Sequence, residues 1–530
     1  MKRSVGIDFG TSTTLISVRD VGNPARVLVL GELDPWIPSV FGIDKSGNVL
    51  IGEDALNKLT PERILFSTKS LIGRRQKEVE LCGTTLKTSL VAQEIISKAM
   101  QSAKELEGSG IFKDSDVYVS CPAGWTYEAR RELANIYVAV GLDIDVGDFI
   151  DEPVAASLHW KNEHWQNAKG EIQGKTVVYD AGGGTLDIAL VEIGVDNEFT
   201  VLSTEGLPIS GDHLDNGIIQ ELQKQIQSSD LEKIFLPNLG LRAREIKENL
   251  STQMRREIPL GRGFDSVVSM DRSTLEDVFS SQLEKSLNRA KATVRAAQTR
   301  TRRNISPTEI RSAEWSEFSD EIRYVALVGG MSQIPVVTAR AKIVFPKATV
   351  EVLPNPQSSV VLGLTYGREV EQLNLPRPPV RFIADCSDGF KSWSEVVYEA
   401  FTPLYDSAEV SRGSSHLGLT WEMVNKGSST LHVEIRAEAP NRSKSTMRFK
   451  EIGEAASRTS FGFDADHGEV IRFKMYANGD LELVGGQSQR QQLELRLEKW
   501  PKAKGSMIIE VSQSSPLTSN YRFDEGWRNR

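Results

Sequence analysis

Two short segments of the chain place an acid, a glycine and a hydroxyl at the same spacing. Residues 5–18 read VGIDFGTSTTLISV and residues 177–193 read VVYDAGGGTLDIALVEI, so the pattern D-x-G-x-x-T occurs twice. Glycines allow a tight turn and a close approach of backbone N–H groups to a ligand, and such N–H groups with hydroxyls suit a phosphate chain. The equivalent positions are Asp8, Gly10 and Thr13 in the first segment and Asp180, Gly182 and Thr185 in the second.

The acid in each segment has a different task, because phosphate oxygens would repel a carboxylate. Mg²⁺ accompanies nucleotide phosphates and is often held by one or two carboxylates together with water and phosphate oxygens. We therefore expect Asp8 and Asp180 to bind a hydrated Mg²⁺, and the two turns to hold the phosphates of one nucleotide from both sides. One such pattern alone is more often only a hairpin turn, and its repeat is what favours the clamp.

Apolar runs on both sides of each turn predict two strand–turn–strand hairpins, about 170 residues apart, which is the length of a domain. A chain of 530 residues is too long for one core and should form three or four folding units. Between the hairpins we expect a strand over 117–120, a helix over 127–140 and a short strand that ends at Asp151 and Glu152. A later buried strand ends at Gly329 and Gly330, where a ring or ribose could lie close to the backbone.

Composition excludes several classes of protein. The net charge of −9 argues against nucleic acid as the partner. Three widely spaced cysteines without a CxxC pair favour a reducing compartment, so we expect a cytoplasmic protein, and six histidines without paired-ligand spacing argue against a metal held by nitrogen or sulfur. The N-terminus lacks the apolar core of a signal peptide, and no apolar run of about 18 residues predicts a membrane span.

Five segments in this order resemble the nucleotide-binding domain of the DnaK-type heat-shock chaperones, the heat-shock protein 70 family, within the actin, sugar-kinase and chaperone ATPase superfamily. They are GIDFGTSTT, SCPAGW, DEPVAASL, DAGGGTLDIAL and LVGGMSQIP. The resemblance covers residues 1 to about 370. It implies an α/β fold of two actin-like, ribonuclease-H-like lobes followed by a mainly β, sandwich-like C-terminal domain, and it implies slow hydrolysis of ATP to ADP with Mg²⁺.

Shorter matches extend the resemblance. TKSLIGRR, residues 68–75, is similar to the segment that carries the family's catalytic lysine, which Lys69 matches. Pro122 and Arg130 resemble the family's proline switch and arginine relay, and Glu152 falls on the glutamate beside the metal and the attacking water. The segments GDHLDNGII, IKENLST and LPNPQSSVVLGLTYG resemble the glycine-acid segment, the adenosine-contacting helix and the closing helix.

The resemblance and the residue types together imply a site. The implied catalytic residues are Lys69, Glu152, Asp180, Thr185 and Asp187. The implied nucleotide contacts are Asp8, Gly10, Thr11, Ser12, Thr13, Gly182, Gly183, Gly184, Thr185, Gly211, Asp212, Lys247, Ser251, Gly329, Gly330 and Met331. Plainer roles remain open, with Lys69 as a solvated charge, Glu152 as a helix-start acid and Asp187 as a strand-end cap.

The base side of the implied site departs from the family. Glu248 stands where the family has an adenine-stacking arginine, and Arg244 stands where it has a glutamate. Gln333 replaces an arginine after the glycine pair, and the pair Gln357-Ser358 replaces two acids. We therefore expect weaker cation stacking on adenine, with lower ATP affinity or base selectivity.

The remaining segments are allotted coarsely. We expect upper subdomains at residues 39–115, ending in a helix over 90–106, and at 212–320. Within the second, the basic run 288–304 is read as a solvated helix face and loop, with an acidic partner as the alternative. Prolines mark a linker at 371–381 that is less apolar than the family's docking linker.

Residues 382–530 predict a β domain. Several segments alternate apolar and polar residues with period two, including 429–440, 469–486 and 506–515, and Asn478-Gly479 is a strong hairpin signal. The segment FTPLYD, residues 401–406, is loosely similar to the opening of the family's substrate-binding sandwich. No long amphipathic pattern follows residue 510, so no helical lid is expected.

Two functions from different classes follow. The first is an ATP-driven chaperone-like protein whose nucleotide state controls polypeptide binding by the β domain, with a J-domain protein and a nucleotide-exchange factor as possible co-chaperones. The second is a nucleotide-gated module that docks one dedicated partner protein. The appended β domain and the Lys69 segment argue against a filament-forming actin relative, and a sugar kinase is further still from these motifs.

Overall fold

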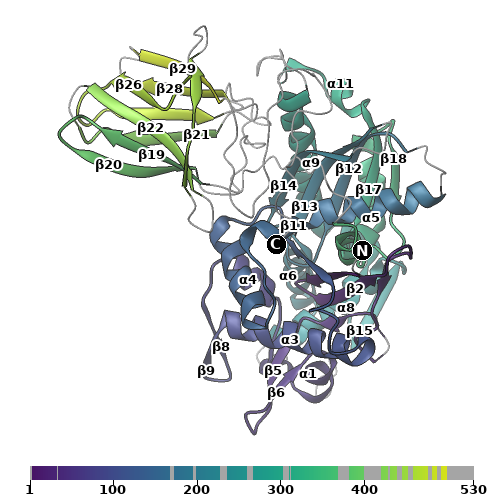
Figure 1. Cartoon of the computed structure of the whole chain (residues 1–530). Helices are drawn as coiled ribbons and strands as arrows, with labels where there is room; N and C mark the ends of the chain where they lie inside the picture. The colour runs from purple at the N-terminus through teal and green to yellow at the C-terminus, as the bar shows by residue number, and fades with distance from the viewer. Residues whose placement is uncertain are drawn as a thin grey trace.

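The computed structural model has two α/β lobes and a separate β-sandwich (Figure 1). It describes residues 3–32, 34–167, 172–194, 199–226, 236–259, 267–301, 310, 312–367, 381–398, 419–427, 430–438, 444–451, 457–475, 480–485 and 491–497. None of the helices among these residues combines the length and apolarity that crossing a bilayer would require.

The first lobe is built on a sheet whose strand order is β11-β10-β1-β2-β3, with β4 paired to the start of β2. The hairpin β1–β2 is antiparallel, whereas β10 and β11 add to it in parallel. The strands are β1 (Ser4–Phe9), β2 (Thr13–Arg19), β3 (Arg26–Val27), β4 (Ile37–Pro38), β10 (Asp116–Cys121) and β11 (Phe149–Asp151). A parallel neighbour needs a long crossover, and the segments before β10 and β11 supply it.

The second lobe repeats this topology. Its sheet has the order β14-β13-β12-β17-β18, with an antiparallel hairpin β12–β13 and two parallel neighbours on its other side. The strands are β12 (Gly174–Ala181), β13 (Leu186–Ile193), β14 (Phe199–Leu207), β17 (Ile322–Val328) and β18 (Thr349–Val352). The two hairpins predicted from the repeated motif are therefore confirmed. Each supplies two inner strands of its sheet.

The lobes meet through two helices that follow the last strand of each sheet. Helix α5 (Glu152–Asn167) follows β11, α13 (Ser359–Leu364) follows β18, and the two pack against each other. A Cβ on Gly363 would lie 1.7 Å from the backbone oxygen of Ala155, so the crossing leaves no room for a side chain. Val154, Val178 and Leu364 belong to one buried cluster that draws on both lobes.

Further elements cover each lobe. On the first are α1 (Glu53–Lys58), η1 (Pro61–Arg63), α2 (Thr68–Gly73), α3 (Thr88–Glu107), α4 (Tyr127–Ala139) and η2 (Val146–Asp148), with small sheets of β5 (Phe41–Ile43), β6 (Val49–Ile51) and β7 (Ile64–Leu65), and of β8 (Glu78–Leu81) and β9 (Thr84–Lys87). On the second are α6 (Gly211–Gln223), α8 (Leu236–Leu250), α9 (Arg272–Thr301), α11 (Trp315–Ser319), η3 (Gly330–Gln333) and α12 (Pro335–Val344), with the hairpin β15 (Arg255–Pro259) and β16 (Val267–Asp271). The helices predicted over 90–106 and 127–140 correspond to α3 and α4.

The basic run 288–304 is not a solvated helix face over its described part, and that prediction is wrong. Residues up to 301 continue α9, which packs on β13 and β14. Ala290, Val294 and Ala297 are buried there, and the Arg289 guanidinium lies 3.8 Å from Glu205. Small side chains bring the helix close to the sheet, and the Arg295 guanidinium lies 5.4 Å from the ring centre of Phe318.

The C-terminal strands form two sheets with a shared core. One sheet has the order β20-β19-β22-β23 with β26 paired to β22, and the other has the order β21-β27-β28-β29-β24-β25. Phe382 and Leu431 of the first sheet and Phe449 and Phe473 of the second are buried in one cluster. The strands are β19 (Arg381–Ser387), β20 (Ser392–Tyr398), β21 (Leu419–Val424), β22 (Thr430–Glu438), β23 (Lys444–Thr446), β24 (Phe449–Glu451), β25 (Ser457–Arg458), β26 (Ser460–Asp464), β27 (Val470–Met475), β28 (Asp480–Gly485) and β29 (Gln491–Leu497).

The antiparallel pair β27–β28 confirms the hairpin expected around Asn478-Gly479, although the turn itself lies outside the described residues. Also outside them are the linker up to residue 380, the segment 401–406 and the predicted strand 506–515. A two-layer sandwich agrees with the period-two alternation that predicted the domain.

The close crossing of α5 and α13 gives a test of the lobe interface. Gly363→Ala should lower the free energy of unfolding by about 3 kcal/mol or more, because the new Cβ meets backbone that cannot move aside. Gly240→Ala, also in a helix, meets nothing within 4 Å and should be neutral or slightly stabilising. Scanning calorimetry compares the two variants, and equal melting temperatures would contradict this account of the interface.

Candidate nucleotide site

The turns of the two repeated hairpins have the same local structure. Gly10 N–H donates to Thr13 O at 3.0 Å, and Gly182 N–H donates to Thr185 O at 3.0 Å. The turns also face each other across the two lobes. A Cβ on Gly183 would lie 2.3 Å from Ser12 Oγ. A Cβ on Gly184 would lie 2.1 Å from Thr11 Oγ1. A side chain at either position would have to displace the hydroxyls of the opposing segments.

Four carboxylates gather beside these turns around one ammonium group. Asp8 and Asp180 each stand one residue before the end of their strand, β1 and β12, while Glu152 begins α5 and Asp187 lies on β13. All four are at most 8% exposed, and Lys69, on the first turn of α2, is 4% exposed. The Lys69 ammonium pairs with Glu152 Oε1 and lies 3.9 Å from Asp8 Oδ1. Lys69 is therefore not a solvated charge, and Asp187 is a buried acid near the start of β13.

The neighbouring strand and loop hold two of these acids in place. Ser120 Oγ, at the end of β10, donates to Asp8 Oδ1 at 2.7 Å. Ala123 N–H, in the loop that follows, donates to Asp187 Oδ1 at 2.6 Å. Parallel strands bring their carboxyl ends to one edge of a sheet, so β10 necessarily ends beside β1. The acids are thus fixed by hydrogen bonds from the fold itself.

The charge balance of this cluster favours a bound cation. Burial raises the pKa of Glu152 to about 8 and the pKa of Asp187 to about 6, and it raises the pKa of Asp180 well above its ordinary value, with neighbouring carboxylates adding to the effect. Burial disfavours the charged form of Lys69, but the nearby Glu152 and Asp8 outweigh it and raise its pKa. The raised pKa values show that the charged forms of these carboxylates are costly beside a single ammonium, and a divalent cation would offset that cost.

The residues present therefore fit Mg²⁺ with a phosphate chain. Within the described part of the chain, no three His, Cys, Asp or Glu side chains are close enough together to form a complete metal cage. Mg²⁺ accepts one or two carboxylates and takes its other ligands from water and phosphate, so Asp8 and Asp180 are a suitable donor set. The glycine turns present backbone and hydroxyl groups that suit phosphate oxygens, and a side chain at Gly183 or Gly184 would crowd those hydroxyls.

A buried ion pair connects this cluster to the loop after β10. The Arg130 guanidinium donates to Pro122 O at 3.2 Å, to Ala123 O at 3.4 Å and to Asp151 Oδ1 at 2.7 Å. Asp151 immediately precedes Glu152, and Ala123 is the residue that holds Asp187. Arg130 therefore joins the proline loop, the end of β11 and the start of α5, as the relay implied by the resemblance would require.

The start of α6 and the last turn of α8 approach the second turn. Gly211 N–H donates to Gly182 O at 3.2 Å, and Asp212 N–H donates to Gly183 O at 2.9 Å. A Cβ on Gly211 would lie 3.1 Å from Lys247 Nζ and 3.4 Å from Met331 Sδ. These predicted contacts are therefore brought to one place by elements far apart in the sequence.

The glycine pair after β17, Gly329 and Gly330, lies beside Asp180, one of the acids expected to bind the cation. Gly329 has φ of 79°, and a Cβ there would lie 2.4 Å from Ala181 O and 2.6 Å from Asp180 Oδ1. Gly330 begins η3, and its missing Cβ would lie 3.5 Å from Gln357 Nε2. Ser251 follows α8, and its hydroxyl donates to Lys247 O at 3.3 Å. Gly329 and Gly330 therefore lie between Asp180, on the side expected to hold the phosphates, and Gln357, on the side expected to hold the base.

The residues near the expected base position that depart from the family lie among charged and aromatic neighbours. Arg244 lies 3.6 Å from both Asp212 and Asp215, and its guanidinium lies 5.2 Å from the ring centre of Phe66 in the first lobe. Lys247 pairs with Asp215 at 2.7 Å. Burial raises the pKa of Glu248, against the attraction of Lys247 and Arg244. Arg244 is thus used for ion pairs and for a contact between the lobes.

Several residues of this site escaped the sequence reasoning. Ser120, Asp151 and Asp215 each contact a predicted site residue, but none has a spacing that would mark it. Ser70, beside Lys69, also lies 2.7 Å from the position of a Cβ on Gly184. Each stands in a segment already singled out, Ser120 in SCPAGW, Asp151 in DEPVAASL and Asp215 in GDHLDNGII, but only the fold shows which residue it contacts.

Comparison with known proteins places these motifs in a family. The family model described as Hsp70 protein matches residues 4–370. The chain is similar to the chaperone protein DnaK of Stenotrophomonas maltophilia (strain R551-3), with 28% identity over 395 residues. It is also similar to the DnaK proteins of Buchnera aphidicola subsp. Schizaphis graminum (strain Sg), with 26% identity over 392 residues, and of Guillardia theta, with 27% over 389 residues. Each match covers 68% of this chain and 59% of the relative.

Substituting Asp180 tests the cation site. Asp180→Asn should make nucleotide binding nearly independent of Mg²⁺ and weaken binding of MgADP about tenfold or more, because one of the carboxylates that would hold the cation is lost. Calorimetric titration with ADP, with and without Mg²⁺, measures the change. Asp143→Asn, at an exposed position, is the control and should behave as the unaltered protein does. Equal dependence on Mg²⁺ in both variants would remove Asp180 from the cation site.

Proposed function

Because the chain belongs to the Hsp70 family, we propose that its two lobes bind ATP with Mg²⁺, hydrolyse it slowly, and use the nucleotide state to control polypeptide binding by the β domain. The observation that carries this proposal is the pair of equivalent turns that face each other beside four buried carboxylates and Lys69. Backbone donors, a cation site and a fixed lysine are the parts that phosphoryl transfer requires.

Each part of the cleft has a proposed task. Thr11, Ser12 and Thr13 of the first turn and Gly182, Gly183, Gly184 and Thr185 of the second hold the phosphates. Asp8 and Asp180 hold the hydrated Mg²⁺, which when bound neutralises charge on the phosphate oxygens. Lys69 stabilises charge that develops on the transferred phosphoryl group, and it is aimed there by its pairing with Glu152.

Water must also be positioned for hydrolysis. Glu152 and Asp187 line the buried cluster and accept hydrogen bonds, so they are suited to orient a water molecule between them and the phosphates. Ala123 N–H holds Asp187. Arg130 binds both Pro122 O and Asp151, the residue before Glu152, so the loop at Pro122 is joined to both acids. Because this loop contacts the acids of the site, hydrolysis or exchange of the nucleotide would displace it. We propose that this displacement begins the signal from the nucleotide site to the β domain.

The β domain is the proposed polypeptide-binding unit. A two-sheet sandwich presents edge strands, and an extended chain can add to such an edge through main-chain hydrogen bonds. Unfolded polypeptides are the proposed clients, with a J-domain protein and a nucleotide-exchange factor as proposed co-chaperones. Binding to one dedicated partner instead is the outcome that would favour a nucleotide-gated docking module.

Turnover of ATP by a lysine variant tests the catalytic assignment. Lys69→Ala should lower the rate by about 10²–10³-fold, because a charge that stabilises the transition state is lost, while ADP binding changes far less. Lys98→Ala, at an exposed position on α3, is the control and should keep the full rate. A denatured protein should stimulate the unaltered chain, and a panel of unrelated clients separates general capture from a single stoichiometric partner. Unchanged turnover in Lys69→Ala would refute the assignment of Lys69.

The altered base side gives a gain-of-affinity test. Glu248→Arg should tighten ATP binding about threefold to thirtyfold, because a guanidinium can stack on adenine where a carboxylate cannot. Glu284→Arg, at an exposed position on α9, makes the same charge change away from the cleft and should have little effect. Fluorescence titration with ATP and GTP measures both affinity and base selectivity. If both variants gained the same affinity for ATP, the gain would come from the change in net charge and not from stacking on adenine.

A further inference from the structure

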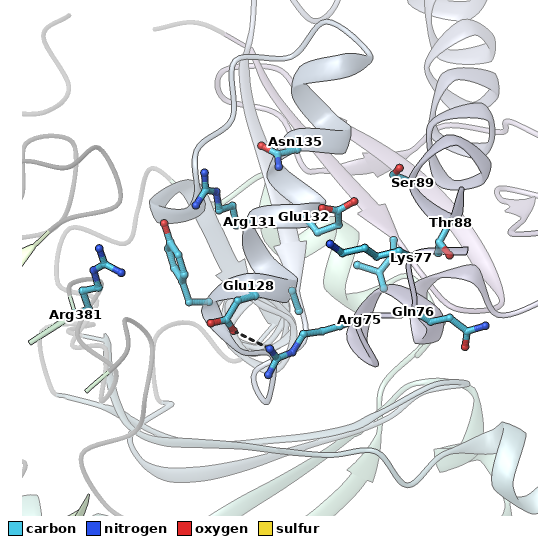
Figure 2. Close-up of a pocket in the computed structure, with 13 residues that line it drawn as sticks. Arg75, Gln76, Lys77, Thr88, Ser89, Glu128, Arg131, Glu132, Asn135 and Arg381 are labelled. Carbon is cyan, nitrogen blue, oxygen red and sulfur yellow. Dashed lines mark ion pairs between the residues drawn. The ribbon is translucent and has the colours of Figure 1, made fainter. Parts of the chain in front are cut away.

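A cavity of about 540 Å³ lies in the first lobe between the end of α2, the start of α3 and the first half of α4. Figure 2 shows Arg75, Lys77, Thr88 and Ser89 on one side and Arg131 with Glu132 on α4. Arg381, at the start of β19, also lines it. None of these residues belongs to the proposed nucleotide cleft, although α2 contributes Lys69 to that cleft.

The cavity carries cationic groups with capacity to bind an anion. Arg75 approaches Glu128 only to 4.0 Å, and both side chains are largely exposed, so their pairing is weak. Lys77 and Arg131 form no ion pair with any described residue. Arg75 is also held in the left-handed region, with φ of 59°, which a non-glycine residue seldom adopts. Four cationic side chains, with Arg381, therefore line the space together with two acids, Glu128 and Glu132.

The start of α3 adds backbone donors to these cations. This helix has 20 residues, and in the described structure no side chain caps its N-terminus and no acid lies in its first turn. Thr88 N–H donates to Lys77 O at 2.8 Å, and the N–H groups of the residues that follow, with the helix dipole, make such an end favourable for an anion. Thr88, its first residue, is 2% exposed, lines the cavity, and its Oγ1 has no hydrogen-bond partner among the described residues. A buried hydroxyl without a partner is costly, and a ligand oxygen would satisfy it.

We propose that this cavity binds a small phosphate monoester whose organic body carries hydroxyl or amino groups. The phosphate fits the start of α3 with Arg131 and Lys77, because hydroxyls, N–H groups and planar guanidinium donors all suit its oxygens. The volume is typical of sites for small organic molecules and larger than inorganic phosphate requires. Glu128, Glu132 and Asn135 accept hydrogen bonds from the body, which packs against Tyr127.

Calorimetric titration of the full chain, saturated with MgADP so that the cleft is filled, tests the proposal. The probes are ribose 5-phosphate, ribose and inorganic phosphate. Ribose 5-phosphate should bind saturably and at least about tenfold more tightly than inorganic phosphate, and ribose should not bind. Absence of saturable binding by about 10 mM ribose 5-phosphate, or equal affinity for inorganic phosphate, would overturn the proposal.

Charge-reversal variants locate the binding. Arg131→Glu and Lys77→Glu should each weaken the affinity for ribose 5-phosphate at least about tenfold. Lys113→Glu, at an exposed position, makes the same charge change and should leave the affinity unchanged. Equal affinities in all three variants would refute the site. Binding of ADP, measured first for every variant, shows that the fold and the cleft are intact.

A near-isosteric variant separates binding from folding. Thr88→Val removes the unpartnered hydroxyl and should leave the melting temperature equal or higher, because an unsatisfied buried group is lost. It should also weaken the affinity for ribose 5-phosphate about threefold or more, since the ligand loses a donor. A variant with unchanged affinity would contradict the role of Thr88 in the site.

Discussion

The burial of four carboxylates beside a single ammonium group is the constraint on which the rest of the structure depends. Removing charges from water is costly, and like charges in a shared site raise one another's pKa. Lys69 offsets part of this cost through Glu152, and Ser120 and Ala123 supply hydrogen bonds to Asp8 and Asp187. Breaking a buried ion pair of this kind typically costs about 3–5 kcal/mol, so the cluster is maintained only by a fold that holds every partner in place.

The duplicated topology provides that fold. Asp8 and Asp180 stand at equivalent places in two sheets of the same strand order, each before a turn that faces its counterpart. The distance between the turns is set elsewhere, where α5 crosses α13 with no space at Gly363 for a side chain. Since α5 begins at Glu152, the helix that joins the lobes also carries an acid of the cluster. Packing between the lobes and the chemistry of the cleft are therefore linked by one element.

The local sequence pattern predicted the helices and strands well where the conformation depends mainly on neighbouring residues in the chain. Glycine turns between apolar runs gave the two hairpins, and period-two alternation gave the β domain. The basic run on α9 was misread because counting charges ignores the small residues between them. Ala290, Val294 and Ala297 face the sheet, and this burial is decided by the strands on which α9 packs.

The sequence by itself determined the repeated acid–glycine–hydroxyl pattern, its resemblance to the Hsp70 family and the exchange of charges at Arg244 and Glu248. Only the tertiary structure decided that Lys69 is buried against Glu152, that Ser120 holds Asp8, and that Arg130 joins Pro122 to Asp151. It also decided that Arg75, Thr88 and Arg131 line one cavity. The physical reason is that spacing along a chain fixes turns and faces, whereas desolvation and pairing depend on which distant segments meet.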